Sequence, residues 1–512
     1  MIPGTTSTTG RAREAVERCA LPGADPATAV PALAAVLVED GHCATDEAAR
    51  VAPPLIELCR HYGNEPFTPL EEVRRRLGTD KGAFGRLLEL SRRVPELGAA
   101  VLAGPAGKYW SNTVLPLEEA GALQAALTGT PALPHILGLY PGPTCMFRCH
   151  FCVRVTGARY AASALDEGNA VLASVIDEMP THNPHALYVS GGLEPLTNPG
   201  LGALVARAAS RGFRMTLYTN AFSLTAQTLG RQPGLWDLDA VRTSLYGLDD
   251  AEYEATTGKK GAFTRVRDNL LAFQRLRSAQ GHPVRLGLNH IVLPGRAHRL
   301  LGLVDFIAEL DAGAPDRPVD FLNLREDYSG RPDGRLTERE RSELRDVLHA
   351  FEEKAARLTP TLRVDLGYAL HGLKAGAGAV LPRIRPEDMR PAGHLPVAAQ
   401  IDLLGDVYLY REAGFPGLAG AERYVAGRVG PGTTLREVAE RFASGPGVDP
   451  RPGDEYFMDG FDQVVAARLN QMAADTAAGW GDRRGFLNTR PPAPADSPRT
   501  SLAPHLDTKG GT

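Results

Sequence analysis

The sequence has few cysteines, no long apolar run and no excess of charge of either sign. Its 512 residues include six cysteines and no stretch of 18 or more apolar residues, which argues against a disulfide scaffold and a membrane-spanning helix. The N-terminal segment lacks the apolar core of a secretion signal. Lys and Arg number 56 against 60 Asp and Glu, a net charge of −4. This balance disfavours binding to nucleic acid or membranes through a basic surface, so we expect a cytoplasmic protein with neither partner.

Two patterns of apolar residues divide the chain. Residues 1–130 show apolar residues at helical spacing, interrupted by Gly and Pro. From Pro134 onward, β-rich runs alternate with amphipathic helical stretches, which implies parallel strands joined by helical crossovers. The expected strands are Ile136–Tyr140, Ala186–Ser190, Met215–Thr219, Ala240–Leu245, Arg285–Leu293 and Val319–Leu324. Six such units predict an α/β fold, a partial (β/α)6 barrel with an open side.

The remainder of the chain predicts an extension of this barrel. A charged helix is expected at Thr337–Leu358, and a strand pair at Val397–Leu403 and Asp406–Tyr410 reads as a hairpin that covers the barrel. The last residues are rich in Pro, Ser and Thr, which is typical of disorder. We therefore expect four regions: an N-terminal helical region (1–130), a barrel core (131–335), a C-terminal extension with the capping hairpin (336–490) and a disordered tail (491–512).

Three of the six cysteines lie within eight residues. Cys145, Cys149 and Cys152 follow the first expected strand, where α/β barrels place their active sites. Zinc, with His150 or a distant residue as fourth ligand, is one interpretation, but zinc sites usually combine two separate ligand pairs and no second pair follows. An iron–sulfur cluster with one iron left open is favoured; three unligated cysteines are the remaining alternative. We expect the other cysteines, Cys19, Cys43 and Cys59, to be small buried side chains.

The Cys-x3-Cys-x2-Cys spacing, with Phe151 before the third cysteine, resembles the radical S-adenosylmethionine (SAM) superfamily. The resemblance implies that Cys145, Cys149 and Cys152 hold one [4Fe–4S] cluster, whose open iron binds the amino and carboxylate groups of SAM. No cysteine follows Cys152, so we expect no auxiliary cluster.

Motifs at the ends of the later strands resemble the same superfamily. The segment SGGLEP (190–195) is similar to its Gly-Gly-Glu element, with Leu193 inserted. This implies that Glu194 binds the methionyl amino group of SAM, while the glycines let the backbone approach the ligand closely. Further similarities are Thr219-Asn220 after the third strand, Ser244 in the fourth and Asn289-His290-Ile291 in the fifth. The resemblance thus assigns cofactor contacts to Phe151, Gly191, Gly192, Glu194, Asn220, Ser244 and Ile291.

Longer stretches resemble the radical SAM ammonia-lyases of desosamine-type deoxyaminosugar biosynthesis for macrolide antibiotics. They include residues 139–160, 190–202 and 242–260, and the similarity extends over about residues 15–490. It implies conversion of dTDP-4-amino-4,6-dideoxy-D-glucose into dTDP-3-dehydro-4,6-dideoxy-D-glucose plus ammonia. It also implies an external one-electron donor, such as flavodoxin or ferredoxin.

The implied chemistry begins with loss of the C3 hydrogen of the sugar and requires a base near O3 and hydrogen-bond donors around it. Arg325, Glu326 and Tyr328 follow the sixth strand and are the expected catalytic residues, although a charged loop has the same composition. Tyr246 and Arg154 are the next candidates, Lys259-Lys260 is a candidate for the nucleotide diphosphate, and Tyr408, Tyr410 and Arg411 are candidates for closing the barrel over the nucleotide. We interpret His182 and His185 as turn residues.

Three other functions remain open at this stage. A radical SAM dehydrogenase that oxidises a nucleotide-sugar alcohol would share the same first step. A peptide-modifying radical enzyme is disfavoured because such enzymes usually carry further cluster cysteines. A structural zinc protein is the non-enzymatic alternative.

Overall fold

The computed structural model describes residues 26–94, 97–98, 101–102, 107–152, 155–326, 336–374 and 383–481. Cys19, Arg154, Tyr328 and the tail expected to be disordered lie outside these ranges. The chain divides into two compact units. One comprises residues 1–121, 371–383 and 464–506, and the other comprises 122–370, 384–463 and 507–512. The four regions drawn from the sequence remain a prediction.

The first unit is helical, as the N-terminal pattern predicts. Its helices are α2 (Pro26–Glu39), α3 (Thr45–Asn64), α4 (Leu70–Arg76), α5 (Lys81–Arg93), α7 (Gly107–Tyr109), α8 (Leu115–Glu119) and the part of α19 (Gly460–Ala477) that follows residue 463. The Leu70 amide, at the start of α4, donates to Oδ1 of Asp475 in α19 at 2.7 Å, and Arg468 of α19 pairs with Glu118 of α8. Residues 350 and 405 positions apart therefore pack in one unit, and helical periodicity does not reveal such contacts.

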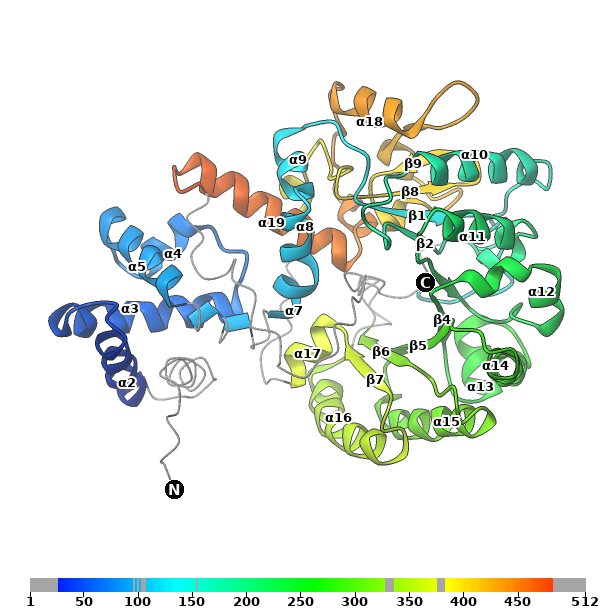
Figure 1. Ribbon diagram of the computed structural model, residues 1–512, viewed down its shortest axis with the longest axis horizontal. Coiled ribbons are helices and arrows are strands. Elements are labelled where there is room, and N and C mark those ends of the chain that lie inside the picture. Colours follow the sequence, from blue (N-terminus) through cyan, green and yellow to red (C-terminus); the bar gives the residue numbers. More distant parts are fainter. Residues whose placement is uncertain are drawn as a thin grey trace. The chain divides into compact units, whose positions relative to one another are not determined.

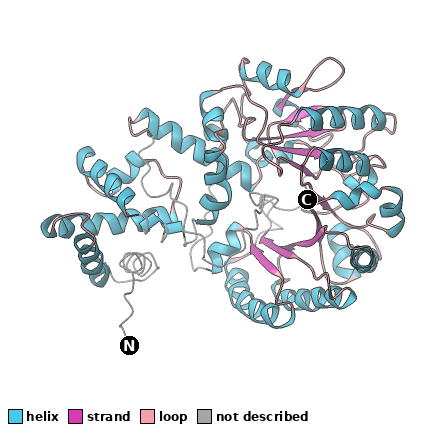
Figure 2. Ribbon diagram, viewed as in Figure 1, coloured by secondary structure: helices cyan, strands magenta, loops and turns pink. Residues whose placement is uncertain are grey.

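The second unit contains a ten-stranded sheet in the order β10-β9-β8-β1-β2-β3-β4-β5-β6-β7 (Figures 1 and 2). Strands β1 to β7 run parallel, β8 is parallel to β1, and β9 and β10 are antiparallel to their neighbours. The strands are β1 (Ile136–Tyr140), β2 (Leu187–Val189), β3 (Thr216–Thr219), β4 (Ala240–Leu245), β5 (Arg285–Val292), β6 (Phe321–Glu326), β7 (Arg363–Leu366), β8 (Ala398–Asp402), β9 (Asp406–Tyr408) and β10 (Val425–Arg428). All six predicted strands form, and the predicted α/β class is confirmed.

Helices follow the parallel strands, and Figure 1 shows α10, α11 and α14 to α16 along the outer side of the curved sheet. The helices of this unit are α9 (Ala122–Thr128), α10 (Ala164–Glu178), α11 (Leu201–Ser210), α12 (Ala226–Arg231), α13 (Asp250–Thr257), α14 (Ala262–Ala279), α15 (Leu300–Gly313), α16 (Glu338–Leu358), α17 (Tyr368–Lys374, which continues into the first unit) and α18 (Leu435–Ala443). Thr337 begins α16 as an N-cap in a capping box with Glu340, a local signal that fixes the start of a helix.

The two faces of the sheet differ in polarity because side chains alternate along each strand. One face carries Tyr218, Arg242 and Asn289, and the register pairs Tyr218 with Arg242, Arg242 with Gly287 and Gly287 with Phe321. We call it the cavity face. The opposite face carries leucines and valines, such as Leu217, Val241 and Leu288, which are buried on the side of the helices.

The C-terminal hairpin forms but does not cover the sheet. Strand β8 is fully buried and pairs with β1 over five residues, so the hairpin extends the sheet at its β1 edge. All five residues of its sequence, AAQID, are buried, and the hairpin pattern alone did not show that this strand would pair with β1. The short edge strands β7 and β10 were also not predicted, because neither contains an apolar run. None of the helices in the described ranges combines the length and apolar composition needed to cross a membrane.

Candidate active site

The cysteine loop follows β1 and is fixed to the end of α13. The amide of Arg148 donates to the Thr257 carbonyl at 2.8 Å, and the amide of His150 donates to that of Thr256 at 3.1 Å. The Cys152 amide donates to the Cys149 carbonyl at 3.1 Å, which closes a turn between the last two cysteines. All three cysteines of the loop are half-buried. The loop is thus held in place by main-chain contacts, and its thiols stay accessible.

The thiols open into a cavity at the carboxyl ends of β1 to β5. Its wall brings together residues from five strand ends, although they are far apart in the sequence. They are Cys145, Phe147, Cys149, Cys152, Ser190, Gly191, Gly192, Leu193, Glu194, Pro195, Tyr218, Thr219, Asn220, Ser244, Tyr246 and Asn289. The predicted residues Cys145, Cys149, Cys152, Gly191, Gly192, Glu194, Asn220 and Ser244 are all in this wall.

Glu194 is buried in the cavity wall and accepts three hydrogen bonds. Its Oε1 accepts from the hydroxyl of Thr219 and from the amide of Leu196, and its Oε2 accepts from the amide of Asn220 at 2.9 Å. Burial raises the pKa of this carboxyl above its usual value, although the three hydrogen bonds oppose the shift. A cation bound in the cavity would favour the charged form, so the site suits an ammonium group.

The two glycines before Glu194 are required by the packing of the loop. A Cβ at Gly192 would lie 2.4 Å from the carbonyl oxygen of Gly414, and one at Gly191 would lie 2.6 Å from that of Leu193. Gly192 therefore lets residues of the C-terminal extension approach the loop. The sequence had instead suggested that these glycines let the backbone approach the ligand.

Asn220 links the turn after β3 to the cysteine loop. Its Nδ2 lies 3.9 Å from Sγ of Cys145 and 3.6 Å from Sδ of Met146, while its Oδ1 accepts from the amide of Phe222. The next residue, Ala221, has φ of 54°, the one positive φ of a non-glycine residue in the described ranges. Such a conformation is rare for a residue with a side chain, and here it lies in the turn that directs the Asn220 amide at a cysteine sulfur.

Two predicted cofactor contacts lie just outside the cavity wall. Phe151 is buried and its ring centroid lies 5.7 Å from that of Tyr246, which is in the wall. Ile291 is two residues beyond Asn289 on the same face of β5. Asn289 takes the wall position on this strand, and its Oδ1 has no hydrogen-bond partner among the described residues.

Comparison with known proteins gives three similarities. The family model described as the radical SAM superfamily matches residues 139–305. The dTDP-4-amino-4,6-dideoxy-D-glucose ammonia-lyase of Streptomyces venezuelae is 61% identical over 472 residues, which is 92% of this chain and 97% of the relative. This chain belongs to the radical SAM superfamily. The structure of Streptococcus suis SuiB bound to SAM is 14% identical, with a TM-score of 0.39, and the match covers 70% of this chain and 72% of SuiB. The structure of SuiB bound to the precursor peptide SuiA is 15% identical, with a TM-score of 0.43, and the match covers 63% of this chain and 69% of SuiB.

As a radical SAM protein, the chain uses a [4Fe–4S] cluster and SAM, and the cavity fits both. Cys145, Cys149 and Cys152 offer three thiol ligands in one loop, and such clusters are held by cysteine thiolates. In the described ranges, no three His, Cys, Asp or Glu side chains converge as ligands of one metal ion. A cluster does not need such convergence, because each thiolate binds a different iron. The carboxylate of Glu194 and the unpaired oxygen of Asn289 face the same cavity and suit polar groups of SAM.

The expected catalytic residues after β6 are separated by the alternation of side chains. Arg325 is buried on the cavity face, next to Ile291 in the register. Glu326 points to the opposite side, where it forms a 2.8 Å ion pair with Arg341 of α16, and burial raises its carboxyl pKa. The structure therefore brings Arg325 but not Glu326 to the side of the radical SAM cavity. Tyr328 lies outside the described residues.

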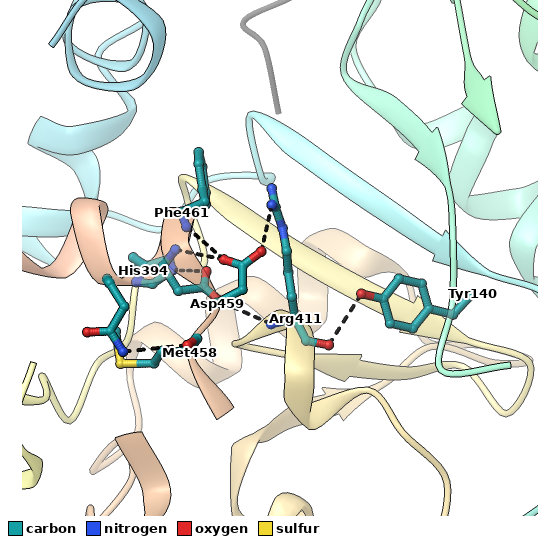
Figure 3. A network of polar contacts seen from close by, with 8 residues as sticks. Tyr140, His394, Arg411, Met458, Asp459 and Phe461 are labelled. Atoms are coloured by element: carbon teal, nitrogen blue, oxygen red, sulfur yellow. Dashed lines mark hydrogen bonds and ion pairs between the residues drawn. The ribbon is translucent and has the colours of Figure 1, made fainter. Parts of the chain in front are cut away.

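The aromatic and basic residues of the C-terminal hairpin are buried in contacts with other parts of the fold and do not line an open cleft. Figure 3 shows that Arg411 forms an ion pair with Asp459, at 3.0 Å, and that its carbonyl accepts a hydrogen bond from Tyr140. Asp462 accepts from the Arg411 amide and contacts His394 at 2.9 Å. The hydroxyl of Tyr408 donates to Asp402, and the Tyr410 ring packs on His394 and Tyr424. The expectation that these residues close over the nucleotide is not met.

The remaining residues singled out in the sequence lie at the surface, in the cavity wall, in the helical unit or in turns. Lys260 is 86% exposed, 3.8 Å from Glu254, and Lys259 lies over the ring of Phe222. Tyr246 is buried in the cavity wall, where burial and the nearby Cys149 raise its phenol pKa. Cys59 is buried as expected, whereas Cys43 is half-buried. His182 and His185 lie in turns before β2.

Replacing Glu194 by glutamine should weaken SAM binding while leaving the iron content unchanged. The substitution keeps the size of the side chain but removes the charge that attracts an ammonium group, which corresponds to about a 10- to 100-fold loss of affinity. Affinity of the wild type should also fall as the pH drops through the raised pKa of Glu194, because the carboxyl must be charged to bind a cation. Binding is measured by titration of the anaerobically reconstituted protein.

A matched control for this variant is Glu178→Gln. Glu178 also accepts two main-chain hydrogen bonds, from Leu435 and Arg436, but it lies outside the cavity wall. It should therefore bind SAM like the wild type. Unchanged affinity in Glu194→Gln would show that the inserted Leu193 places the ammonium group elsewhere.

Proposed function

We propose that this radical SAM protein is an ammonia-lyase that converts dTDP-4-amino-4,6-dideoxy-D-glucose into dTDP-3-dehydro-4,6-dideoxy-D-glucose and ammonia. The observation that carries the proposal is the 61% identity to the Streptomyces venezuelae ammonia-lyase over 97% of that protein. The cavity supports it, since the three cysteines and the polar strand-end residues lie in one wall. The product serves deoxyaminosugar biosynthesis of the desosamine type.

When bound, the cluster supplies the electron that cleaves SAM into methionine and a 5′-deoxyadenosyl radical. In our proposal Cys145, Cys149 and Cys152 hold the cluster, and Asn220 orients its amide towards the Cys145 sulfur. Glu194 binds the amino group of SAM. The other SAM contacts come from Gly191, Gly192, Ser244 and Ile291. Asn289 of β5 adds a hydrogen-bond acceptor, a role that the resemblance did not assign to it.

The residues around the cysteines also restrict what reaches the radical. Phe147 and Phe151 both pack against Tyr246 beside the thiols, with ring centroids 6.0 and 5.7 Å from that of Tyr246. Burial raises the pKa of the Tyr246 phenol well above its usual value, so this side chain stays neutral. An aromatic wall of this kind excludes water from a reactive species.

On the sugar, loss of the C3 hydrogen leaves a radical next to the C4 ammonium. Loss of the O3 proton then expels ammonia from C4, and one electron and one proton convert the remaining radical to the 3-keto sugar. The sugar is neither oxidised nor reduced overall, because one electron and one proton at C4 replace the hydrogen atom taken from C3. Over the whole turnover, two electrons and one proton convert SAM into methionine and deoxyadenosine. Arg325, on the cavity side of β6, is the proposed donor to O3, and Tyr328 remains a candidate for the base.

The electrons come from an external one-electron donor, for which we propose flavodoxin or ferredoxin. Arg148 and His150, in the cysteine loop, are exposed, and Arg265 is exposed beside Phe222, whose ring contacts Phe147. The exposed arginines next to the cluster loop suit an acidic donor protein. We place the enzyme in the cytoplasm, where cysteines remain reduced.

Product analysis tests the function directly. The reconstituted protein, incubated under argon with the 4-amino sugar nucleotide, SAM and a reductant, should release ammonia and deoxyadenosine in equal amounts. Omission of the sugar nucleotide should abolish ammonia release. A 3-keto product that retains its C4 nitrogen would instead identify a dehydrogenase, and SAM cleavage without any change in the sugar would contradict the proposed substrate.

A further inference from the structure

Arg242, in the middle of β4, is a buried cation without an acidic partner in the described part of the chain. Its exposed fraction is 8%. Its Nε and Nη1 atoms have no hydrogen-bond partner among the described residues. A buried charge is costly unless a counter-ion or hydrogen bonds compensate it. Such an arginine is therefore suited to an anion that arrives with a ligand.

Two aromatic rings hold the guanidinium in place. Its central carbon lies 5.1 Å from the centroid of Tyr218 and 5.0 Å from that of Phe321. Phe321 is two strands away, and it reaches Arg242 across Gly287, where a Cβ would lie 1.8 Å from the phenyl ring. Cation–π contacts orient the group but do not neutralise its charge.

The guanidinium is close to the cofactor cavity. Tyr218, which contacts it, is in the cavity wall, and so is Ser244, two residues further along β4 on the same face. Gln400 of β8 lies on this face too, since it pairs with Gly138, which pairs with Tyr188. Gln400 is fully buried, and neither its Nε2 nor its Oε1 has a hydrogen-bond partner in the described ranges. The cavity face thus carries a cation close to the SAM site and, four strands away in the sheet order, a buried amide.

We propose that Arg242 binds the diphosphate of the nucleotide-sugar substrate, an assignment that rests on the proposed function. The diphosphate is the permanent negative charge of that substrate, and guanidinium groups form strong hydrogen bonds with phosphate oxygens. Arg242 replaces Lys259-Lys260 in this role. Lys260 is exposed beside Glu254, whereas Arg242 is buried beside the cavity wall.

The test compares the Arg242→Met and Arg242→Lys variants with a matched control, Arg285→Met. The guanidinium of Arg285 also lies over the Phe321 ring, at 5.9 Å, but it is paired with Asp239. The probes are thymidine diphosphate and thymidine, titrated calorimetrically into the anaerobically reconstituted enzyme with SAM present. We expect R242M to lose at least about tenfold in affinity for thymidine diphosphate and to bind thymidine like the wild type. R242K should lose less, and R285M should bind both probes normally.

Thermal unfolding separates binding from a structural role. Replacing an unpaired buried cation by an apolar side chain of similar length should leave the midpoint of the ligand-free protein unchanged or raise it. The rise in midpoint that thymidine diphosphate causes in the wild type should be lost in R242M. A large drop of the ligand-free midpoint, with the rise retained, would make Arg242 a structural residue and overturn the proposal.

The remaining outcomes separate this inference from the proposed function. If the wild type releases ammonia from the sugar nucleotide and R242M binds thymidine diphosphate normally, the assignment of Arg242 fails while the function stands. If R242M loses affinity for SAM instead, the anion is the SAM carboxylate and the proposal is also overturned. A wild type that neither binds thymidine diphosphate nor releases ammonia contradicts the proposed function itself. Should R242M fail to fold, R242K decides, since normal binding of thymidine diphosphate by that variant would count against the proposal.

Discussion

Replacing Cys145, Cys149 or Cys152 by alanine is expected to abolish iron binding and SAM cleavage together. All three thiols line one cavity wall in a loop fixed by main-chain hydrogen bonds, and a [4Fe–4S] cluster that keeps one iron open for SAM has no protein ligand to spare. Each variant should lose the brown colour of the reconstituted protein and produce no deoxyadenosine above background. Iron analysis, the visible spectrum and chromatography of the SAM products measure the three effects.

Cys59→Ala is the control for these variants. Cys59 is buried in α3 and lies outside the cavity wall, so its replacement should cost about 1 kcal/mol of stability and leave the iron content unchanged. Full SAM cleavage by any one of the three loop variants would remove that cysteine from the ligand set. Loss of iron in Cys59→Ala would show that general destabilisation, rather than ligation, explains the loop variants.

The parts of the fold that local patterns determine were predicted well. The strands β1 and β4 begin and end where apolar spacing and turn residues place them. The partners of β8 and α19 were not predicted. Strand β8 inserts beside β1 although some 260 residues separate them, and the second part of α19 packs with helices near the other end of the chain. Periodicity determines which face of an element is buried but not which distant element covers it.

For the site, the residues at strand ends could be predicted because parallel strands end at one edge of the sheet. The resemblance to the radical SAM superfamily assigned Asn220 and Ser244 to such strand ends, and both lie in the cavity wall. The strand-end argument did not separate residues that are adjacent in a strand, so Arg325 and Glu326 were treated alike although they point to opposite sides. Arg242 was missed for a different reason. The chain contains many arginines, and only the structure shows that this one is buried without an acidic partner in the described ranges.

Deuterium at C3 of the 4-amino sugar nucleotide is expected to appear in deoxyadenosine. The proposed mechanism removes the C3 hydrogen before ammonia leaves, and the second electron comes from the donor, so the abstracted hydrogen is not returned. Each molecule of ammonia should therefore be matched by one deuterated deoxyadenosine, which mass spectrometry of the nucleoside measures. Ammonia release with unlabelled deoxyadenosine would place the abstraction at another carbon.

The 4-hydroxy analogue tests whether the leaving group controls the outcome. Its C3 radical also loses the O3 proton, but the C4 substituent departs as hydroxide, a poorer leaving group than ammonia. Transfer of one electron from this radical to the oxidised form of the external electron donor then becomes the easier step, and it gives a 3-keto sugar that keeps the C4 oxygen. The 4-amino and 4-hydroxy substrates should thus diverge after the same C–H cleavage, with similar deuterium content in deoxyadenosine and different sugar products. Equal elimination from both would mean that the protein, through groups around C4, determines the reaction more strongly than the substituent does.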